Sequence, residues 1–562
     1  MRYLVKDNNG RAVSVFFSGM REDAKIHRTT RRSFVATGAA VAVAIQFPSI
    51  RSRDDYDLVI RGGEVFDGTG IDPYHSDVAI KGDRIAAVAP DIAGKGKEEI
   101  DARGMAVAPG FIDIHSHGDG NMEADPRVES VIRQGVTTMV VGADGGSRAT
   151  GAPDKSFASL FAAIDRLKPG PNVASMVGFG TLREVVIGNM DRAATPDEIA
   201  RMTAMVDNAL NDGACGGSSG LEYTPGAFAS VAELTALARP LAGRRLPYAT
   251  HMRNEDDRLV EAIEEAIAVA RGAGCALQIS HLKTQGPRNW PKLEKVFLLI
   301  DAARSARTDV AFDRYPYVAY ATGLTNLFPV WSRDGGIDRF LARVADAATA
   351  SRIKDETIAK VGLIGGWDNV QISGVRAVED RDAEGKRLGS YSQSRGLDPY
   401  KATIGLLTRS KGDVGMLGHA MSEENLEKIL AHPLGMVCSD GGGFAVDGPT
   451  RRGSPHPRGA GTFPRVLGRY VRERKALTLQ QAIRKMTSQP AMRARLMDRG
   501  RVGQGRAADL VVFDPATVAD KATFDMPFQY PVGINVVVVN GVVALRDGQR
   551  RREGSGRGLR SS

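Results

Sequence analysis

The stretch Ala108-Pro-Gly-Phe-Ile-Asp-Ile-His-Ser-His-Gly118 ends an apolar run with two histidines, His115 and His117, that are one residue apart. On a strand, residues i and i+2 face the same side, so both imidazoles point into one space. Two neutral imidazoles that converge at the end of a strand supply half of the ligands of a divalent metal ion. The stretch therefore predicts a buried strand that ends in a metal site, provided that other strand ends supply the remaining ligands.

Downstream of this stretch, short apolar runs alternate with helical patterns. In one such helix, Thr195 and Glu198 form a capping box and Pro196 stands at the first helical position. Eight strand and helix units predict an α/β fold, a distorted TIM (β/α)8 barrel, whose active site lies at the carboxyl ends of the strands. We expect the strands to end near Ile114, Val141, Val177, Ser219, Thr250, Ser280, Asp313 and Cys438.

Hairpin patterns without intervening helices occur near both ends of the chain, after residue 56 and again after residue 508. Such patterns are typical of short paired strands. The long gap between the seventh and eighth strands predicts a lid-like insertion near residues 325–400 of the barrel. We therefore predict a small β-sandwich from residues 51–108 and 495–550, a barrel domain from residues 109–494, and a basic tail at residues 551–562.

The N-terminus has the pattern of a targeting segment. Thr30-Arg-Arg-Ser-Phe-Val precedes an apolar, Ala-rich run at residues 36–45, which resembles a twin-arginine export signal. The run is too short to span a bilayer, so we expect no membrane span. Residues 1–50 are thus predicted to be a leader, cleaved near residues 42–44, with initiation at Met20 as an alternative start. The enzyme would then be periplasmic or secreted, and cytoplasmic if the leader does not function.

The formal net charge of +9 is concentrated at the chain ends. Residues 1–50 hold eight Lys and Arg against three Asp and Glu, and residues 541–562 hold six against two. The body is nearly neutral and has no basic cluster with aromatic platforms, so we expect no nucleic-acid partner. Cys215, Cys275 and Cys438 lie far apart without a C-x-x-C pair, which argues against a disulfide framework or a zinc knuckle.

Three further residues of ligand type follow predicted strands. His251 follows the fifth strand, His281 the sixth and Asp440 the eighth. Together with His115 and His117, they would point from the same rim of the barrel. This mixture of imidazole and carboxylate suits Zn²⁺, and Mn²⁺, Co²⁺ or Fe²⁺ could replace it in vitro.

This constellation resembles the amidohydrolase superfamily and, within it, the D-aminoacylase (N-acyl-D-amino-acid deacylase) family. The matching motifs run in order from about residue 56 to residue 545. They are Gly135-Val-Thr-Thr, Val177-Gly-Phe-Gly-Thr-Leu-Arg, Ser219-Gly-Leu-Glu-Tyr-Thr-Pro-Gly, Thr250-His-Met-Arg-Asn-Glu, Ile279-Ser-His-Leu-Lys, Asp313-Arg-Tyr-Pro-Tyr, Ser439-Asp-Gly, His456-Pro-Arg, Met486-Thr-Ser-Gln-Pro-Ala and Arg506-Ala-Ala-Asp-Leu-Val-Val-Phe-Asp.

The resemblance implies a metal-dependent enzyme that hydrolyses N-acyl-D-amino acids to a carboxylate and a free D-amino acid. It implies one or two Zn²⁺ ions, with His115 and His117 as ligands of one site and His251 and His281 as ligands of the other. Asp440 would be the general base and later the acid. The chemistry agrees, because amide hydrolysis needs a water of lowered pKa, a polarised carbonyl and a nearby carboxylate. The preference for D-substrates comes from the resemblance alone.

The remaining metal ligand is where this chain departs from the family. Many amidohydrolases use a carboxylated lysine after the fourth strand, but residues 213–220 contain no lysine. D-aminoacylases carry a cysteine after the second strand, and the matching residue here is Asp144. A carboxylate can replace a thiolate as an anionic ligand, although it is harder and can change the metal preference. The alternative is that Asp144 only shapes a glycine-rich turn.

A small N-acyl amino acid carries a carboxylate, which needs cationic and hydroxyl partners. Lys283 lies two residues after His281, and the resemblance adds Tyr223, Tyr315 and Arg458 as substrate-binding candidates. Arg458 could hold the carboxylate through two parallel hydrogen bonds. The chain departs from the family at two further positions. Phe179 stands where relatives often have a histidine, and Ala321 stands where relatives can have a hydroxyl side chain.

Two other functions stay open at this point. A related amidohydrolase could act on cyclic amides or on dipeptides with a C-terminal D-residue. A non-catalytic metal-binding paralogue would be expected to lack Asp440 or a metal histidine, and this chain keeps them. A nucleotide-binding protein is not supported, since no P-loop or strand-linked G-x-G-x-x-G occurs. The sequence does not predict an oligomeric state.

Overall fold

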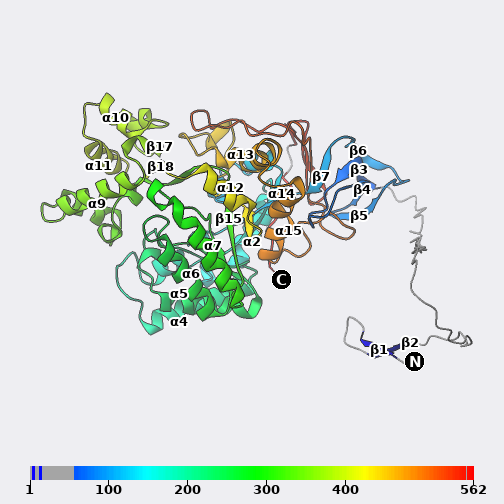
Figure 1. The fold of residues 1–562 in the computed structure, drawn as a ribbon, viewed down its shortest axis with the longest axis horizontal. Helices are drawn as coiled ribbons and strands as arrows, with labels where there is room; N and C mark the ends of the chain where they lie inside the picture. The colour runs from blue at the N-terminus through cyan, green and yellow to red at the C-terminus, as the bar shows by residue number, and fades with distance from the viewer. Residues whose placement is uncertain (1–2, 7–11, 16–55, 552–553, 562) are drawn as a thin grey trace, which may run out of the picture. The chain divides into compact units, whose positions relative to one another are not determined.

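The computed structural model describes residues 3–6, 12–15, 56–551 and 554–561 (Figure 1). Residues 1–52 form one unit, in which β1 (Tyr3–Lys6) and β2 (Ala12–Val15) pair antiparallel. The predicted twin-arginine segment at residues 30–45 lies outside the described residues. No helix among the described residues is both long and apolar enough to span a bilayer. The second unit, from Arg53 onward, holds all elements discussed below.

Parallel strands form the barrel in the order in which they occur along the chain, as predicted. The third strand is split at Met176, so that its first part pairs with the second strand and its second part with the fourth. The strands are β8 (Phe111–Asp113), β9 (Val136–Val141), β10 (Asn172–Ser175) with β11 (Val177–Gly178), β12 (Gly217–Gly220), β13 (Pro247–His251), β14 (Ala276–Ile279), β15 (Val310–Arg314) and β19 (Gly435–Val437).

The barrel closes where the last strand meets the first. The backbone N–H of Asp440 donates to the carbonyl of His115 at 2.8 Å, and the N–H of His117 donates to the carbonyl of Gly441 at 3.0 Å. The buried carboxylate of Asp113 accepts from the N–H of Ser439 at 2.8 Å and from its hydroxyl. These contacts hold His115, His117 and Asp440 at one seam of the barrel.

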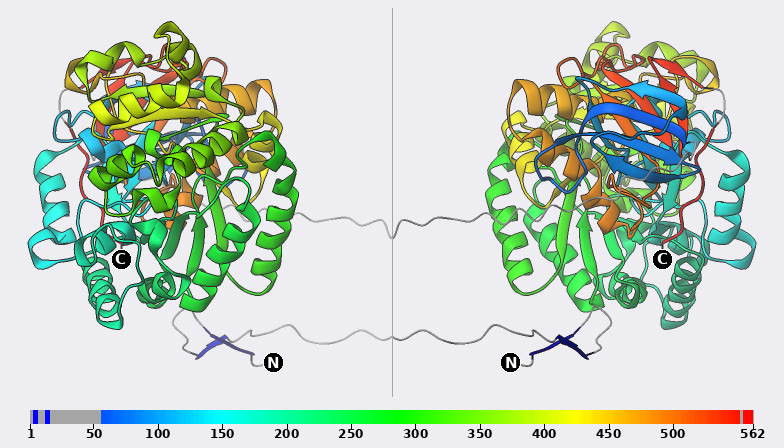
Figure 2. Two further views of the ribbon diagram at one scale, coloured as in Figure 1. Left: turned by 90° about the vertical axis from the view of Figure 1, so that its left-hand side faces the viewer. Right: turned by 90° about the vertical axis from the view of Figure 1, so that its right-hand side faces the viewer.

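Helices cover the outside of the barrel (Figures 1 and 2). The capping box predicted from Thr195 and Glu198 opens the helix after the third strand, whose inner face buries Met202, Val206 and Leu210. The helices between barrel strands include α2 (Phe157–Leu167), α4 (Pro196–Asn211), α5 (Val231–Arg244), α6 (Leu259–Ala273) and α7 (Leu293–Ser305).

Strands from both ends of the second unit form one nine-stranded sheet, seen as blue and red ribbons lying side by side in Figure 2. Its two halves join where β7 (Ala106–Pro109) pairs antiparallel with β20 (Leu510–Phe513). Apolar side chains from both halves pack against one another, among them Ile60, Val107 and Val538. The other strands are β3 (Tyr56–Val65), β4 (Tyr74–Lys81), β5 (Arg84–Ala89), β6 (Gly96–Asp101), β21 (Ile534–Val539), β22 (Val542–Arg546) and β23 (Gln549–Arg550).

An insertion separates β15 from β19. Its strands β16 (Ala319–Gly323), β17 (Val370–Val375) and β18 (Val414–His419) form an antiparallel sheet in the order β16-β18-β17. It therefore extends beyond the predicted range of 325–400 on both sides. Its helices are α8 (Ile337–Ala345), α9 (Ala350–Leu363), α10 (Leu388–Ser394) and α11 (Pro399–Arg409).

The residues predicted to form a basic tail pack against the barrel where residues 554–561 are described. Leu559 is 8% exposed and belongs to the same apolar cluster as barrel residues Ile112 and Ala174. Its N–H donates to the carbonyl of Val173, whose own N–H donates to Arg557. Arg557 and Arg560 pair with Asp83 and Asp165, so the positive charges of this segment serve the fold.

Candidate functional site

His115 and His117 follow β8 and present their Nε2 atoms to the same two carboxylates. Asp144 Oδ2 lies 3.2 Å from His115 Nε2 and 3.4 Å from His117 Nε2. Asp440 Oδ1 lies 3.5 Å and 3.2 Å from the same two nitrogen atoms. The predicted convergence of the two imidazoles is thus what the structure shows, and two carboxylates complete the group.

His251 at the end of β13 and His281 after β14 form the second pair. Their rings meet edge to face, with His251 Nδ1 3.0 Å from His281 Nε2. His281 Nε2 also lies 3.5 Å from Asp144 Oδ1. Asp144 therefore stands between the two histidine pairs. Its backbone has a φ of 52°, and His281 and Asp440 are left-handed as well, with φ of 34° and 48°.

These residues fit divalent metal ions. His115, His117, Asp144 and Asp440 bring one ligand atom each to a common space, and Asp144, His251 and His281 do so for an adjacent space. Asp144 Oδ1 is buried without a hydrogen-bond partner among the described residues, which is the state expected of an atom that binds an ion. Imidazole and carboxylate are ligands that zinc accepts.

Three of the buried histidines each have a carboxylate near one ring nitrogen, while the other ring nitrogen faces the cluster of potential metal ligands. Asp313 Oδ1 is 3.4 Å from His115 Nδ1, Glu255 Oε1 is 3.1 Å from His281 Nδ1, and Glu222 Oε2 is 3.4 Å from His251 Nε2. Carboxylates that accept a hydrogen bond in this position fix the tautomer and the orientation of a metal-binding imidazole. The contact of Asp313 with His115 is electrostatic, because His115 Nδ1 has no hydrogen-bond partner among the described residues. These three residues were not among the predicted site residues, although Glu255 follows His251 at a spacing of four and Asp313 ends the seventh strand.

Asp440 faces both the first histidine pair and a cation. Its Oδ2 lies 2.8 Å from Arg458 Nη1, and both side chains are buried. Burial alone would raise the pKa of the Asp440 carboxyl, but Arg458 and the neighbouring histidines outweigh it and hold the pKa below its ordinary value. The carboxylate is thus ionised at neutral pH.

Arg458 and Tyr315 leave buried donors without acceptors. Neither Tyr315 Oη nor Arg458 Nη1 has a hydrogen-bond partner among the described residues, so the contact of Arg458 with Asp440 is ionic rather than a directed hydrogen bond. The guanidinium lies over the Tyr315 ring, 4.6 Å from its centroid. Two unsatisfied donors at one place favour an anionic ligand, such as the carboxylate of an amino acid.

Lys283 is already paired. Its Nζ lies 2.6 and 2.7 Å from the two oxygen atoms of Glu255 and 2.6 Å from His281 Nδ1. Burial would lower the pKa of Lys283, but Glu255 outweighs it and raises the pKa above its ordinary value. Lys283 therefore remains charged, and it lies on the wall of the cavity with Glu255 as its ion-pair partner.

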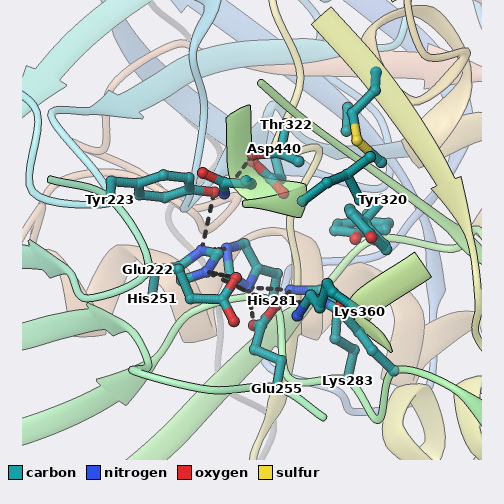
Figure 3. Close-up of a pocket in the computed structure, with 16 residues that line it drawn as sticks. Glu222, Tyr223, His251, Glu255, His281, Lys283, Tyr320, Thr322, Lys360 and Asp440 are labelled. Carbon is teal, nitrogen blue, oxygen red and sulfur yellow. Dashed lines mark hydrogen bonds and ion pairs between the residues drawn. The ribbon is translucent and has the colours of Figure 1, made fainter. Parts of the chain in front are cut away.

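The cavity in front of the histidines is shown in Figure 3. Barrel residues Tyr223, Lys283, Tyr315 and Asp440 contribute to its wall, and Tyr223 Oη lies 3.4 Å from His251 Nδ1. The insertion covers the other side through residues that were not predicted to belong to the site. They are Tyr320, Thr322, Asn326, Leu327, Lys360 and Met416.

The two departures noted in the sequence have different positions. Ala321 lines the cavity, so the absence of a hydroxyl there bears on the substrate. Phe179 is absent from the wall of this cavity; it is 2% exposed and stacks on Tyr248 at a centroid distance of 5.9 Å. Phe179 therefore supports the barrel core rather than the substrate pocket.

Residues 98–404 and 443–545 match the Amidohydrolase family. The chain is 37% identical over 507 residues to the N-acyl-D-glutamate deacylase of Alcaligenes xylosoxydans xylosoxydans, covering 87% of this chain and 93% of that protein. It is 36% identical over 503 residues to the D-aminoacylase of the same organism, covering 86% and 94%.

Among solved structures, the N-acyl-D-glutamate deacylase from Bordetella bronchiseptica, complexed with zinc and a phosphonate inhibitor that mimics the tetrahedral intermediate, has a TM-score of 0.77 at 35% identity. The match covers 90% of this chain and 100% of that chain. A D-aminoacylase structure with a TM-score of 0.75, also at 35% identity, has the same coverage. The chain therefore belongs to the amidohydrolase family and, within it, to the group formed by D-aminoacylase and the N-acyl-D-amino-acid deacylases.

Proposed function

We propose that the protein is a metal-dependent hydrolase that splits N-acyl-D-amino acids into a carboxylate and a free D-amino acid. The position of Asp440 carries this proposal, because one of its oxygen atoms faces His115 and His117 while the other faces Arg458. A base is thus held between a metal-binding pair and a cation suited to a carboxylate. The preference for D-substrates is supported by the names of the relatives.

The residues of this chain divide the chemistry among them. A divalent ion held by the histidines, Asp144 and Asp440 would polarise the carbonyl and lower the pKa of the attacking water. Asp440 takes a proton from that water while the water oxygen adds to the carbonyl carbon. The C–N bond then breaks, and Asp440 returns the proton to the leaving amine. Arg458 and Tyr315 hold the α-carboxylate, which places the amide against Asp440.

A substrate panel tests the proposal. The zinc-loaded protein should hydrolyse N-acetyl-D-amino acids faster than their L-enantiomers, dipeptides with a C-terminal D-residue, or cyclic amides. Asp440→Asn should lose at least about 100-fold in kcat, since general base catalysis contributes that much. Full activity of Asp440→Asn would remove Asp440 from the mechanism. Faster turnover of a cyclic amide or a dipeptide would replace the substrate assignment.

We also propose that residues 1–50 direct export through the twin-arginine route. The support is the Arg31-Arg32 pair ahead of the apolar run at residues 36–45. Replacement of both arginines by lysine should retain the full chain in the cytoplasm, measured by cell fractionation and the mass of the N-terminus. Unchanged periplasmic recovery of the double variant would contradict this route.

A further inference from the structure

We propose that the carboxylate of Asp144 joins the two metal positions, one through each oxygen, and that this bridge makes the centre favour harder divalent ions than a thiolate would. The inference rests on the metal-dependent function proposed above. It concerns the residue at which this chain departs from the cysteine of the D-aminoacylases it resembles.

The two oxygen atoms of Asp144 face different histidine pairs. Oδ2 lies 3.2 Å from His115 Nε2 and 3.4 Å from His117 Nε2, whereas Oδ1 lies 3.5 Å from His281 Nε2. A carboxylate among imidazoles, with one oxygen toward each pair, has the arrangement of a bridging ligand.

The alternative role of Asp144, shaping a glycine-rich turn, would show a recognisable hydrogen bond. An Asp that stabilises a turn accepts a backbone N–H close by in sequence. Among the described residues, Asp144 accepts no backbone N–H, and its Oδ1 has no hydrogen-bond partner. The turn therefore orients the carboxylate instead of being stabilised by it.

The backbone around Asp144 is held in one conformation. Asp144 has a φ of 52° and lies between Gly142 and Gly145, whose φ values are 76° and 78°. A Cβ added at Gly145 would lie 2.6 Å from the backbone N of Gly220, and one added at Gly220 would lie 2.1 Å from the carbonyl oxygen of Asp144. A non-glycine residue in the left-handed region is strained and is retained at functional positions when its surroundings impose it.

No other side chain takes the place of the missing thiolate. Cys438 is the one cysteine that groups with a histidine of the site among the described residues, and it does so with His115 and Asp313 rather than with His117 or Asp144. β12 carries no lysine in Gly217–Gly220. A carboxylate, unlike a thiolate, suits oxygen-preferring ions such as Mn²⁺.

Spectroscopy of the cobalt-loaded protein tests the bridge. Asp144→Cys should show a sulfur-to-cobalt charge-transfer band that the wild type lacks. Asp191→Cys, which places a thiol at an exposed position, is the matched control and should lack the band. A band in the wild type would mean that a native cysteine binds the metal, and a folded Asp144→Cys without a band would mean that position 144 does not; either result overturns the proposal.

Metal competition tests the preference. With Zn²⁺ and Mn²⁺ supplied together, the Mn-to-Zn ratio in the wild type should exceed that in Asp144→Cys by about tenfold, the size of change that alterations around a metal cause. An equal ratio would refute the preference. If Asp144→Cys does not fold, Asp144→Asn takes its place and should bind less metal per chain by elemental analysis, whereas unchanged metal content would refute the bridge. Normal metal binding without D-selective turnover would refute the proposed function and leave the bridge standing.

Discussion

At the scale of single residues, the site consists of potential metal ligands and of carboxylates that contact these ligands from behind. The histidines that bring ligand atoms together are themselves held by Asp313, Glu255 and Glu222 on their opposite nitrogen atoms. Glu255 contacts both Lys283 Nζ and His281 Nδ1. Lys283 Nζ lies 2.6 Å from His281 Nδ1 as well, and a hydrogen bond donated there favours the tautomer that cannot bind a metal through Nε2. Glu255 competes with His281 for this donor, because both of its oxygen atoms accept from the same Nζ.

Glu255→Gln should therefore weaken metal binding. We expect about 10- to 100-fold lower zinc affinity, as for other residues that support a metal-binding histidine, measured by competition with a chelator. Glu265→Gln is the matched control, because Glu265 pairs with Arg253 at the partly exposed edge of the same region. Equal zinc affinity in the wild type and Glu255→Gln would show that Glu255 does not control His281.

Tyr315→Phe tests whether the Tyr315 hydroxyl binds the substrate without contributing to the stability of the fold. The Tyr315 hydroxyl is buried without a hydrogen-bond partner, so its removal should leave the free energy of unfolding unchanged or slightly higher. If the hydroxyl binds the substrate carboxylate, the KM should rise by about tenfold, in line with the roughly 1.5 kcal/mol of a hydrogen bond to a charged group. Urea unfolding and steady-state kinetics test both; an unchanged KM would exclude Tyr315 from substrate binding.

Much of the residue-scale picture could be predicted from the sequence, and the physical reason is local. His115, His117, His251, His281 and Asp440 each follow an apolar strand, and parallel strands of a barrel end on one rim. The pairing of Lys283 with Glu255 could not be predicted, because it joins the loops after two different strands. The lack of a hydrogen-bond partner for Arg458 Nη1 and Tyr315 Oη could not be predicted either, because it depends on the positions of all surrounding side chains.

At the scale of elements, the insertion decides what enters the site. β16 and β18 pair although about 100 residues of chain separate them. The length of the gap between the seventh and eighth strands predicts an insertion there. It does not predict the edges of the insertion, which lie at Ala319 and His419. Lys360 of α9 reaches Asp256 after β13 and anchors the insertion to the barrel. The split of the third strand at Met176 was likewise invisible in an apolar run that reads as one strand.

His419 on β18 makes the insertion sensitive to acid. Its burial, with a smaller effect of Arg387, lowers its pKa from 6.5 to about 4. Between these values the unfolded chain binds a proton that the folded chain does not, so stability is lost as the pH falls from 6.5 towards 4.

Urea unfolding at pH 7, 5.5 and 4.5 measures this effect as a difference between two proteins. The stability of the wild type relative to His419→Asn should decrease with falling pH, and effects of the metal site cancel in the difference. A difference that does not change with pH would contradict the assignment.

At the scale of the whole second unit, which begins at Arg53, its two ends complete the fold. β7 and β20 join the terminal strands into one sheet, and residues 554–561 lie along the barrel where the third strand is split. There Gly558 bridges Val173 of β10, and the N–H of Ser561 donates to the carbonyl of Gly213 ahead of β12. This segment thus lies between β10 and β12. Its composition alone had suggested a basic tail.

Removal of residues 554–562 should therefore destabilise the barrel. Burial of a leucine such as Leu559 contributes about 2 kcal/mol, and each lost backbone hydrogen bond about 1 kcal/mol. We expect the free energy of unfolding to fall by at least about 3 kcal/mol, and Leu559→Ala to account for about 2 to 3 kcal/mol of it. Identical unfolding curves for the full and the shortened chain would show that the segment has no structural role.

The most direct test of the account is the chirality of the product. The zinc-loaded protein is incubated with a racemic N-acetyl amino acid, and the released amino acid is resolved by chiral chromatography. The account predicts that only the D-amino acid appears, that half of the racemate remains as the N-acetyl-L form, and that removal of the metal stops the release. Release of the L-amino acid, of both forms equally, or of neither would contradict it.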